Sequence, residues 1–366
     1  MIKLYNTLSK TKEVFKPIKG KTVGFYTCGP TVYDCAHIGN FRTYIFEDVL
    51  RRVLEFNGYK VNHIENITDV DDKTIKRSIQ KKMSLHNLTE KFTNIFFSDL
   101  KKVNIKPAVK FPRATKHIKQ MVELIQKLLD KNIAYLSDDR SIYFSIKKFK
   151  NYGKFANLDL MGLKEGARVL ADEYQKEQGS DFVLWKKWNK NDGDNFWKQE
   201  FAISDPSTSL PRAYSGQVGT SKRYAIKGRP GWHLECSAMS KKYLGQPFDI
   251  HAGAVDLIFP HHQNEIAQSE AAYGKKMVNY WIHGEHLLVD KKKMAKSAGN
   301  FYALADIIKK DYHPLALRYL CLESHYRSKM NFTWKALDAA QNTLNAIRQL
   351  GQRQKTSKHL NIKTLK

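Results

Sequence analysis

The sequence lacks any run near the roughly 18 consecutive apolar residues that a membrane-spanning helix needs. Its first twenty residues, MIKLYNTLSKTKEVFKPIKG, also lack the unbroken apolar block of a secretory signal peptide. These absences argue against a membrane or secreted protein, and we expect a cytoplasmic one. The 366 residues are 42% apolar, so the chain can form more than one hydrophobic core.

Cysteine is also scarce, and the four thiols lie far apart, at Cys28, Cys35, Cys236 and Cys321. Such spacing excludes the dense disulfide framework of a small secreted domain, and a reducing compartment keeps the residues as thiols. Metal binding or catalysis is then the more informative use of these side chains. The plain alternative is that each is a small buried apolar residue.

Acidic residues are few, 36 against 62 lysines and arginines, which gives a formal net charge of +26. A positive field of this size attracts polyanions and speeds their encounter with the protein. Nucleic acid is therefore the leading partner class. A surface that is simply rich in lysine explains the charge equally well, so the charge alone does not decide.

A strand, a helix and a second strand follow one another near the start of the chain. The run KTVGFYTC predicts a buried strand, and YKVNHIENIT predicts another. Between them, apolar residues recur at helical spacing from Phe41 to Val53, and Gly58 ends the pattern. This βαβ order predicts an α/β fold with a parallel sheet, whose ligands bind at the carboxyl ends of the strands.

The rest of the chain alternates regular and irregular segments. A helix is predicted over 114–132, and the runs SIYFSI and DFVLW predict short strands. Residues 189–227 are rich in Gly, Ser, Asn and Asp, and we predict a mobile loop there. Regular structure resumes with GRPGWHLECSAMSKKYL, the strand FDIHAGAVDLIF, the helix PHHQNEIAQSEAAYG and the strand-like VNYWIHGEHLLV. The last residues predict a basic, frayed tail.

His261 and Glu265 are spaced to share one face of the predicted helix PHHQNEIAQSEAAYG, one turn apart. Cys236 and Cys28 lie on two other predicted elements, so the four can meet only through the fold. Two thiolates, an imidazole and a carboxylate would form a plausible zinc site. Taken singly, each has a plainer reading, as a buried thiol or as a pair on a helix surface.

The turn HIGN lies where a strand gives way to a helix, and free backbone N–H groups at a helix start favour phosphate. Gly39 lets backbone approach a ligand closely, and His37 and Asn40 can add donors. The basic run DKKKMAKSAGN is most often a solvated loop when it occurs alone. The two motifs in this order, each beside a predicted strand–helix unit, are far more specific for a phosphate-bearing substrate.

Over nearly all of residues 1–335 the sequence resembles the cysteinyl-tRNA synthetases, a family of class I aminoacyl-tRNA synthetases. The motifs that carry the resemblance are YTCGPTVYDCAHIGN, NITDVDDKTIKR, GRPGWHLECSAM, FPHHQNEIAQSEAA, KMAKSAGNF and HYRSKMNF. Several are particular to the cysteine-specific family rather than to class I as a whole. The resemblance implies activation of L-cysteine by ATP and transfer of the cysteinyl group to tRNA(Cys).

The resemblance also implies one Zn²⁺ per chain, which selects cysteine through its thiolate. Its ligands map onto Cys28, Cys236, His261 and Glu265. Trp232 and His233 would wall the amino-acid pocket, and Gly29 and Thr68 match positions near the bound amino acid.

For ATP, which enters with Mg²⁺, the resemblance implies two signature segments. His37 and Asn40, with Gly39 between them, would hold phosphates as the amino-acid carboxylate attacks the α-phosphorus. Lys293 and Lys296 of KMAKS would neutralise the charge that develops toward pyrophosphate. Asp256 is a candidate contact to the nucleotide ribose.

The implied architecture is a Rossmann-type parallel sheet with an inserted connective domain and a short helical C-terminal part. The expected divisions are 1–112 and 228–300 for the catalytic halves, 113–227 for the insertion, 301–350 for a helical region and 351–366 for the tail.

The match stops where family members usually continue into an anticodon-reading region, so a separate chain is one candidate source of that function. Two alternatives stay open. One is a cysteine ligase acting on a non-tRNA amine, as in mycothiol synthesis, and the other is a non-catalytic RNA-binding paralogue.

Overall fold

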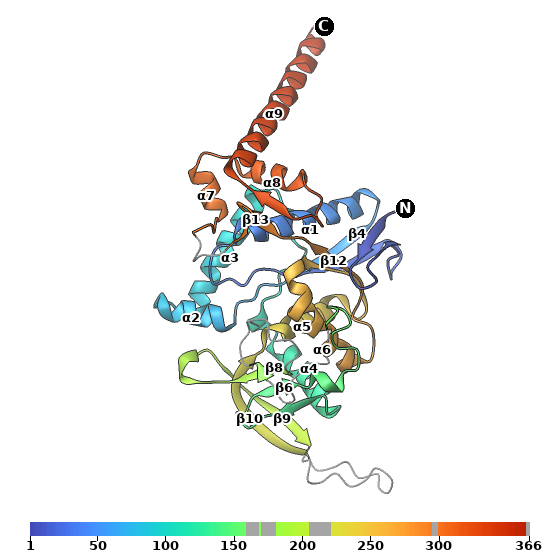
Figure 1. The fold of residues 1–366 in the computed structure, drawn as a ribbon, viewed down its shortest axis with the longest axis vertical. Helices are drawn as coiled ribbons and strands as arrows, with labels where there is room; N and C mark the ends of the chain where they lie inside the picture. The colour runs from blue at the N-terminus through green and yellow to red at the C-terminus, as the bar shows by residue number, and fades with distance from the viewer. Residues whose placement is uncertain (159–167, 170–180, 205–220, 295–298, 364–366) are drawn as a thin grey trace. The chain divides into compact units, whose positions relative to one another are not determined.

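The computed structural model describes residues 1–158, 168–169, 181–204, 221–294 and 299–363 (Figure 1). The chain divides into two compact units, which are described separately. Unit 1 comprises residues 1–34, 54–93 and 108–282, and unit 2 comprises 35–53, 94–107 and 283–366.

A four-stranded sheet with parallel pairing at its centre confirms the predicted strand–helix–strand order. Its strands stand in the order β12-β11-β3-β4, with bounds Val278–Gly284, Phe248–Ala254, Thr22–Thr27 and Lys60–Glu65. Strand β3 pairs in parallel with both β4 and β11. Helix α1, Ile38–Phe56, joins β3 to β4 in sequence. Val23, Phe25 and Tyr26 are fully buried in β3, as expected for a strand covered on both faces.

The second sheet of unit 1 is largely antiparallel and corrects one prediction. It contains β5 (Ala134–Leu136), β6 (Ile142–Phe144), β8 (Asp181–Lys187), β10 (Ser221–Pro230) and β9 (Trp197–Ser204), with the two-residue β7 (Arg168–Val169) beside β8. The antiparallel pairing of β9 with β10 occupies much of 189–227, so the prediction of a mobile loop was wrong for the paired residues. The polar residues of 189–227 mask the alternation of apolar residues that is typical of strands. The apolar residues Phe201, Ile203, Tyr224 and Ile226 pack into the core. Residues 205–220 lie outside the described part of the chain.

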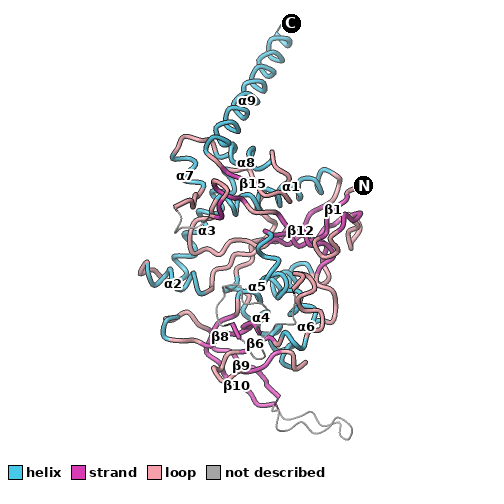
Figure 2. Tube along the Cα trace, viewed as in Figure 1, coloured by secondary structure: helices cyan, strands magenta, loops and turns pink. Residues whose placement is uncertain are grey.

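The helices and hairpin of unit 1 complete this core. A short β-hairpin opens the chain, with β1 (Lys3–Asn6) and β2 (Thr11–Val14). The helices are α2 (Asp72–Gln80), α3 (Leu85–Lys102, which continues into unit 2), α4 (Ile118–Asp130), α5 (Trp232–Leu244) and α6 (Gln263–Tyr273). Helix α4, within the predicted 114–132, buries a stripe of Met121, Leu124, Ile125 and Leu128. Helix α5 contacts β3, β4 and β8. It also packs against α4 and α6 (Figure 2).

Helices α5 and α6 bury polar side chains as well as apolar ones. Glu235, Asn264, Glu265 and Gln268 are all completely shielded from solvent. Burying so many polar groups is costly unless they are paired or serve a ligand. The helix predicted to begin at the proline is preceded by one π-turn, Ile258–His262, and α6 proper starts at Gln263.

Unit 2 contains most of α1, the end of α3, a small sheet and further helices. The strands are β13 (Leu287–Val289), β14 (Lys292–Lys293) and β15 (Met330–Phe332), and the helices are α7 (Leu304–Lys309), α8 (Pro314–Leu322) and α9 (Trp334–Lys363). Helix α8 packs against α9. The prediction of a frayed tail over 351–366 was wrong as far as Lys363, which is helical. After Gly351 the tail has no glycine or proline and is rich in Gln, Lys, Arg and Leu, which favour helix.

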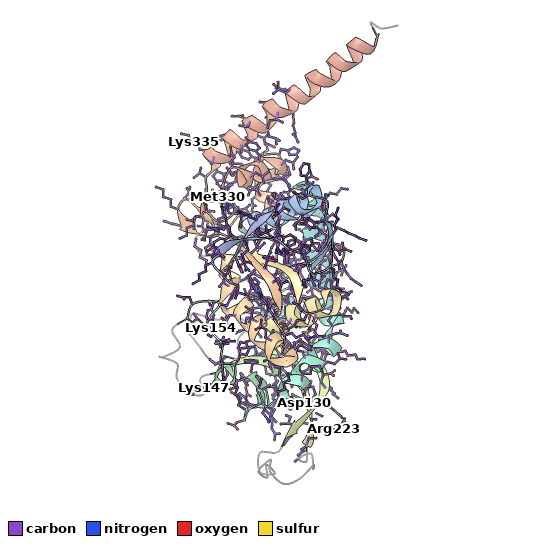
Figure 3. All side chains as sticks on the ribbon, turned by 90° about the vertical axis from the view of Figure 1, so that its right-hand side faces the viewer. Asp130, Lys147, Lys154, Arg223, Met330 and Lys335 are labelled. Atoms are coloured by element: carbon purple, nitrogen blue, oxygen red, sulfur yellow. The ribbon has the colours of Figure 1, made fainter. Side chains whose placement is uncertain are left out.

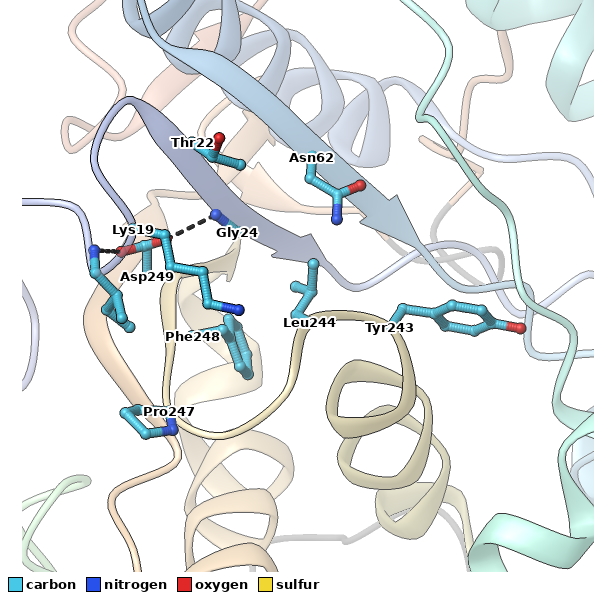
Figure 4. A pocket seen from close by; sticks show the side chains of 10 residues that line it. Lys19, Thr22, Gly24, Asn62, Tyr243, Leu244, Pro247, Phe248 and Asp249 are labelled. Atoms are coloured by element: carbon cyan, nitrogen blue, oxygen red, sulfur yellow. Dashed lines mark hydrogen bonds between the residues drawn. The ribbon is translucent and has the colours of Figure 1, made fainter.

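A pocket of about 130 Å³ lies in unit 1 at the amino ends of β3 and β11 (Figure 4). Thr22, Gly24 and Asp249 line it, and Asp249 accepts the backbone N–H groups of Ile18 and Gly24. This is the end of the parallel sheet opposite to the one where ligands are expected.

The positive charge is carried on the surface: Lys147, Lys154 and Arg223 are among the exposed basic residues of unit 1 (Figure 3). Among the helices that the structure describes, none has the length and apolar character to cross a membrane.

Candidate functional site

Four side chains from three separate segments of unit 1 converge at the carboxyl end of the parallel sheet. We call Cys28, Cys236, His261 and Glu265 the four-donor cluster. Cys28 directly follows β3, Cys236 lies in α5, His261 lies in the π-turn and Glu265 in the first turn of α6. Their ligand atoms all lie within 4.8 Å of one another, so the structure brings the four candidate donors together.

The distances within the cluster fit donors that could share one ion. The two sulfur atoms are 3.9 Å apart, and Cys28 Sγ lies 4.0 Å from Glu265 Oε1. His261 Nε2 lies 3.0 Å from Glu265 Oε1. All but Cys28, which is half-buried, are nearly inaccessible to solvent. Closely spaced, buried thiol, imidazole and carboxylate groups, once deprotonated, are what a metal site requires.

The electrostatics of the cluster favour ionised Cys236 and Glu265 side chains. Burial opposes ionisation of the Cys236 thiol, but a hydrogen bond from Cys28 and the charge on His261 lower its pKa to about 6. Burial likewise opposes ionisation of Glu265, but His251 and His261 lower its pKa to about 2. For His261, burial is outweighed by Glu265 and Cys236, which raise its pKa to about 10. The proton on His261 thus balances part of the negative charge, and a bound metal ion would replace that proton, because a ligating histidine must be neutral.

Two histidines beside the cluster were not predicted from the sequence. His262 Nε2 lies 3.4 Å from Cys28 Sγ, and His251 Nε2 lies 3.1 Å from Glu265 Oε2. With Cys28 and Glu265 they form a second group whose donor atoms lie within 4.8 Å of one another. Helical spacing singled out only the histidine four residues before Glu265, and nothing local marks a histidine on β11.

Trp232 and His233, predicted to wall the amino-acid pocket, open helix α5 beside the cluster. The ring of Trp232 lies 4.3 Å from that of His261. His233 Nδ1 lies 3.0 Å from His261 Nδ1. Burial, aided by the charge on His261, holds the pKa of His233 well below its usual value, so His233 is neutral.

Gly29 and Thr68 are linked through Asn66, which the sequence analysis did not assign. The Asn66 side chain accepts the Gly29 N–H at 3.0 Å and donates to Thr68 Oγ1 at 3.1 Å. Thr68 Oγ1 in turn donates to Glu235 Oε2 at 2.8 Å. Burial raises the pKa of Glu235 well above its usual value. The motif NIT contains both Asn66 and Thr68, but it gives no signal for Glu235, which lies on α5.

In unit 2 the turn HIGN forms a reciprocal cap at the start of α1. Asn40 Oδ1 accepts the His37 N–H, and the Asn40 N–H points to His37 Nδ1, both at 3.1 Å. When His37 is neutral, its Nδ1 is therefore an acceptor and its ring proton sits on Nε2. A Cβ at Gly39 would lie 2.7 Å from Met294 Cε, so the two signature segments meet in this unit.

The remaining predicted contacts are less defined. Lys293 lies in β14 with an exposed side chain, and its carbonyl accepts a hydrogen bond from Asn300. Asp256 is exposed in the turn Val255–Leu257 of unit 1. Lys296 lies outside the described residues.

Comparison with known proteins agrees with this arrangement. The family model "tRNA synthetases class I (C) catalytic domain" matches residues 14–207 and 220–342. The chain is 51% identical over 351 residues to a cysteine–tRNA ligase of Brachyspira hyodysenteriae, covering 95% of this chain and 69% of that protein. It is also 51% identical over 346 residues to the same enzyme of Chlamydia muridarum, covering 94% of this chain and 68% of that protein.

The fold resembles solved class I enzymes. A methionyl-tRNA synthetase of Mycobacterium tuberculosis, solved with methionyl-adenylate, superposes with a TM-score of 0.62 at 14% identity. The match covers 88% of this chain and 69% of that one. From the family match and the identity to these relatives, the chain belongs to the class I aminoacyl-tRNA synthetases, in the family of the cysteine–tRNA ligases.

Proposed function

We propose that this protein is a cysteine–tRNA ligase, which activates L-cysteine with ATP to cysteinyl-adenylate and transfers the cysteinyl group to tRNA(Cys). The observation that carries the proposal is the convergence of the four-donor cluster at the carboxyl end of the parallel sheet. In an enzyme that must recognise the thiol of cysteine, a metal ion held by two protein thiolates could bind the substrate thiol as well.

The cluster fits Zn²⁺, which takes cysteine, histidine and carboxylate donors. When bound, Zn²⁺ supplies a soft centre that prefers the thiolate of cysteine to the hydroxyl of serine. The residues Cys28, Cys236, His261 and Glu265 would hold it. Trp232 stacks on His261 and, with neutral His233, would limit the pocket to a small side chain.

Unit 2 would supply the binding of ATP, which enters with Mg²⁺. His37 offers its Nε2–H, and the turn at Gly39 offers backbone N–H groups, to the phosphates. The carboxylate of cysteine forms a bond to the α-phosphorus as the bond to the β-phosphate oxygen breaks. Lys293, with Lys296, would balance the charge on the departing pyrophosphate. Asp256 would contact the ribose.

The positive net charge fits a tRNA partner, whose backbone is bound largely through lysine and arginine. The ribose hydroxyl of the tRNA end would attack the adenylate carbonyl and release AMP. We further propose a cytoplasmic location and the domain divisions given above, with an inserted domain over 113–227. A separate anticodon-binding chain stays a prediction.

Exchange of pyrophosphate into ATP tests the activation step directly. We expect the zinc-loaded protein to catalyse exchange that depends on L-cysteine and is at least about 1,000-fold slower with L-serine, because a protonated hydroxyl is a poor metal ligand. Radiolabelled pyrophosphate provides the measurement. Exchange that is absent, or equal for the two amino acids, would contradict the proposal.

A second assay separates the acceptors. Supplied with tRNA(Cys) or with glucosaminyl-inositol, the enzyme should charge only the tRNA. Transfer to the amino sugar alone would identify the mycothiol-type ligase. A non-catalytic RNA-binding protein would bind tRNA(Cys) and show no exchange.

His37→Ala tests the phosphate-binding role of the turn HIGN. We expect kcat for exchange to fall by about 100-fold or more, the usual cost of removing one donor to developing charge. The KM for cysteine should change little, because the four-donor cluster is in unit 1. His86→Ala is the matched control, since His86 is exposed in α3. Equal exchange rates for the two variants would remove His37 from the mechanism.

A further inference from the structure

We infer that Glu235 is a positioning residue, which orients the Thr68 hydroxyl to accept a hydrogen bond from the ammonium group of cysteine. The inference rests on the proposed function. It concerns how the enzyme recognises the amino-acid end of its substrate, rather than the thiol.

The bonding of Thr68 leaves one acceptor position open. Its hydroxyl donates its proton to Glu235 Oε2 at 2.8 Å and accepts the Asn66 amide at 3.1 Å. A hydroxyl has one proton and two lone pairs. The proton is therefore committed to Glu235, and one lone pair remains. A cation with N–H donors is the group that such an oriented oxygen can bind.

The location of Thr68 suits this role. Asn66, which bonds Thr68, also accepts the Gly29 N–H and lies 3.6 Å from Cys236 Sγ. The hydroxyl is thus tied to the turn that carries Cys28. In cysteine only three bonds separate the sulfur atom from the ammonium nitrogen. A thiol held at the four-donor cluster therefore brings its ammonium group to the residues beside that cluster.

The unpaired polar atoms beside Thr68 favour a ligand with several N–H donors. Glu235 is completely buried, and its Oε1 has no hydrogen-bond partner among the residues that the structure describes. Glu65 is also buried, at 4% exposure, and its Oε1 is likewise unpaired there. Buried polar atoms without partners are costly. Their presence at this end of the sheet points to a ligand group that donates hydrogen bonds, as an ammonium group does.

A purely structural role would have Glu235 only hold α5 to the segment after β4. The two roles differ for a ligand that keeps the thiol and lacks the ammonium group. The test measures binding of L-cysteine and of 3-mercaptopropionate to zinc-loaded protein by calorimetry, in a phosphine reductant. Wild-type protein should prefer cysteine.

Glu235→Met is expected to weaken cysteine binding by about 10- to 100-fold, the range for hydrogen bonds to charged groups. Binding of 3-mercaptopropionate should change little, so the preference is lost. A thioether of similar length fills the site but is only a weak acceptor for the Thr68 hydroxyl. Glu270→Met is the matched control, because the Glu270 side chain accepts the Met277 N–H at the end of α6 and the change should leave both affinities unchanged.

Two further variants keep the inference falsifiable. Glu235→Asp retains the carboxyl group but is too short to reach Thr68, so it should lose the preference even where Glu235→Met fails to fold. Adding Glu235→Met to Thr68→Val should cause no further loss, since both act through one hydrogen bond. Zinc content is measured for every variant.

Equal weakening of both ligands in zinc-loaded Glu235→Met and Glu235→Asp would overturn the inference, and so would an unchanged preference. These outcomes differ from failure of the proposed function. In that case the wild-type protein itself shows no cysteine-dependent exchange, whatever the variants do.

Discussion

Cys236→Ser is expected to lower bound zinc from about one per chain to near zero. The serine hydroxyl stays protonated at neutral pH, whereas the Cys236 thiol, with its pKa lowered to about 6, readily gives a thiolate. Cysteine-dependent exchange should fall by more than about 100-fold, because the loss of even an outer partner of a metal ligand costs 10- to 100-fold. Metal analysis of the purified protein and the exchange assay provide the two measurements.

The fold should survive this change. Serine is close in size to cysteine, and its hydroxyl can donate to Asn66 Oδ1, which lies 3.6 Å from the present sulfur atom. Cys35→Ser is the matched control, because Cys35 lies outside both groups of candidate metal ligands in the described chain. A Cys236→Ser protein with normal zinc content and normal exchange would refute the proposed metal site.

Gly29→Ala is expected to destabilise unit 1 by about 3 kcal/mol or more, at the upper end of the cost of overpacking. A Cβ at Gly29 would lie 1.7 Å from the backbone oxygen of Asn66. The two segments cannot separate easily, because Thr68 exchanges backbone hydrogen bonds with Pro30 and Val32. Cys28 would move with the turn, so zinc affinity should fall as well. Denaturant unfolding followed by tryptophan fluorescence measures the stability.

Gly24→Ala, within β3, provides the comparison for Gly29, which lies in the turn after that strand. A Cβ at Gly24 would meet its nearest neighbour, Phe248 Cβ, at 3.5 Å, which is ordinary contact (Figure 4). The free energy of unfolding should change by less than about 1 kcal/mol, since alanine also restricts the unfolded chain. If Gly29→Ala were as stable as Gly24→Ala, the close approach of the two segments would be wrong.

Much of the fold was predictable because its signals are local. The apolar run at β3 and the helical spacing after HIGN predicted the strand–helix–strand unit, and the structure has it. The pairing of β9 with β10 was missed because glycine and serine around 205–220 outweighed a clear alternation on either side. The tail was misjudged because its charge was read as disorder, although its residues favour helix.

The site, like the fold, has parts that the sequence predicts and parts that it does not. The sequence by itself determined the choice of the four candidate donors, because each is a thiol, imidazole or carboxylate in a motif of the family that the sequence resembles. Only the tertiary structure decided which neighbours complete the site: His251 and His262 beside the donors, and Asn66 and Glu235 around Thr68. Thr68 and Glu235, for example, are 167 residues apart in sequence. No local pattern records such a meeting, because it arises only when α5 packs against the ends of β3 and β4.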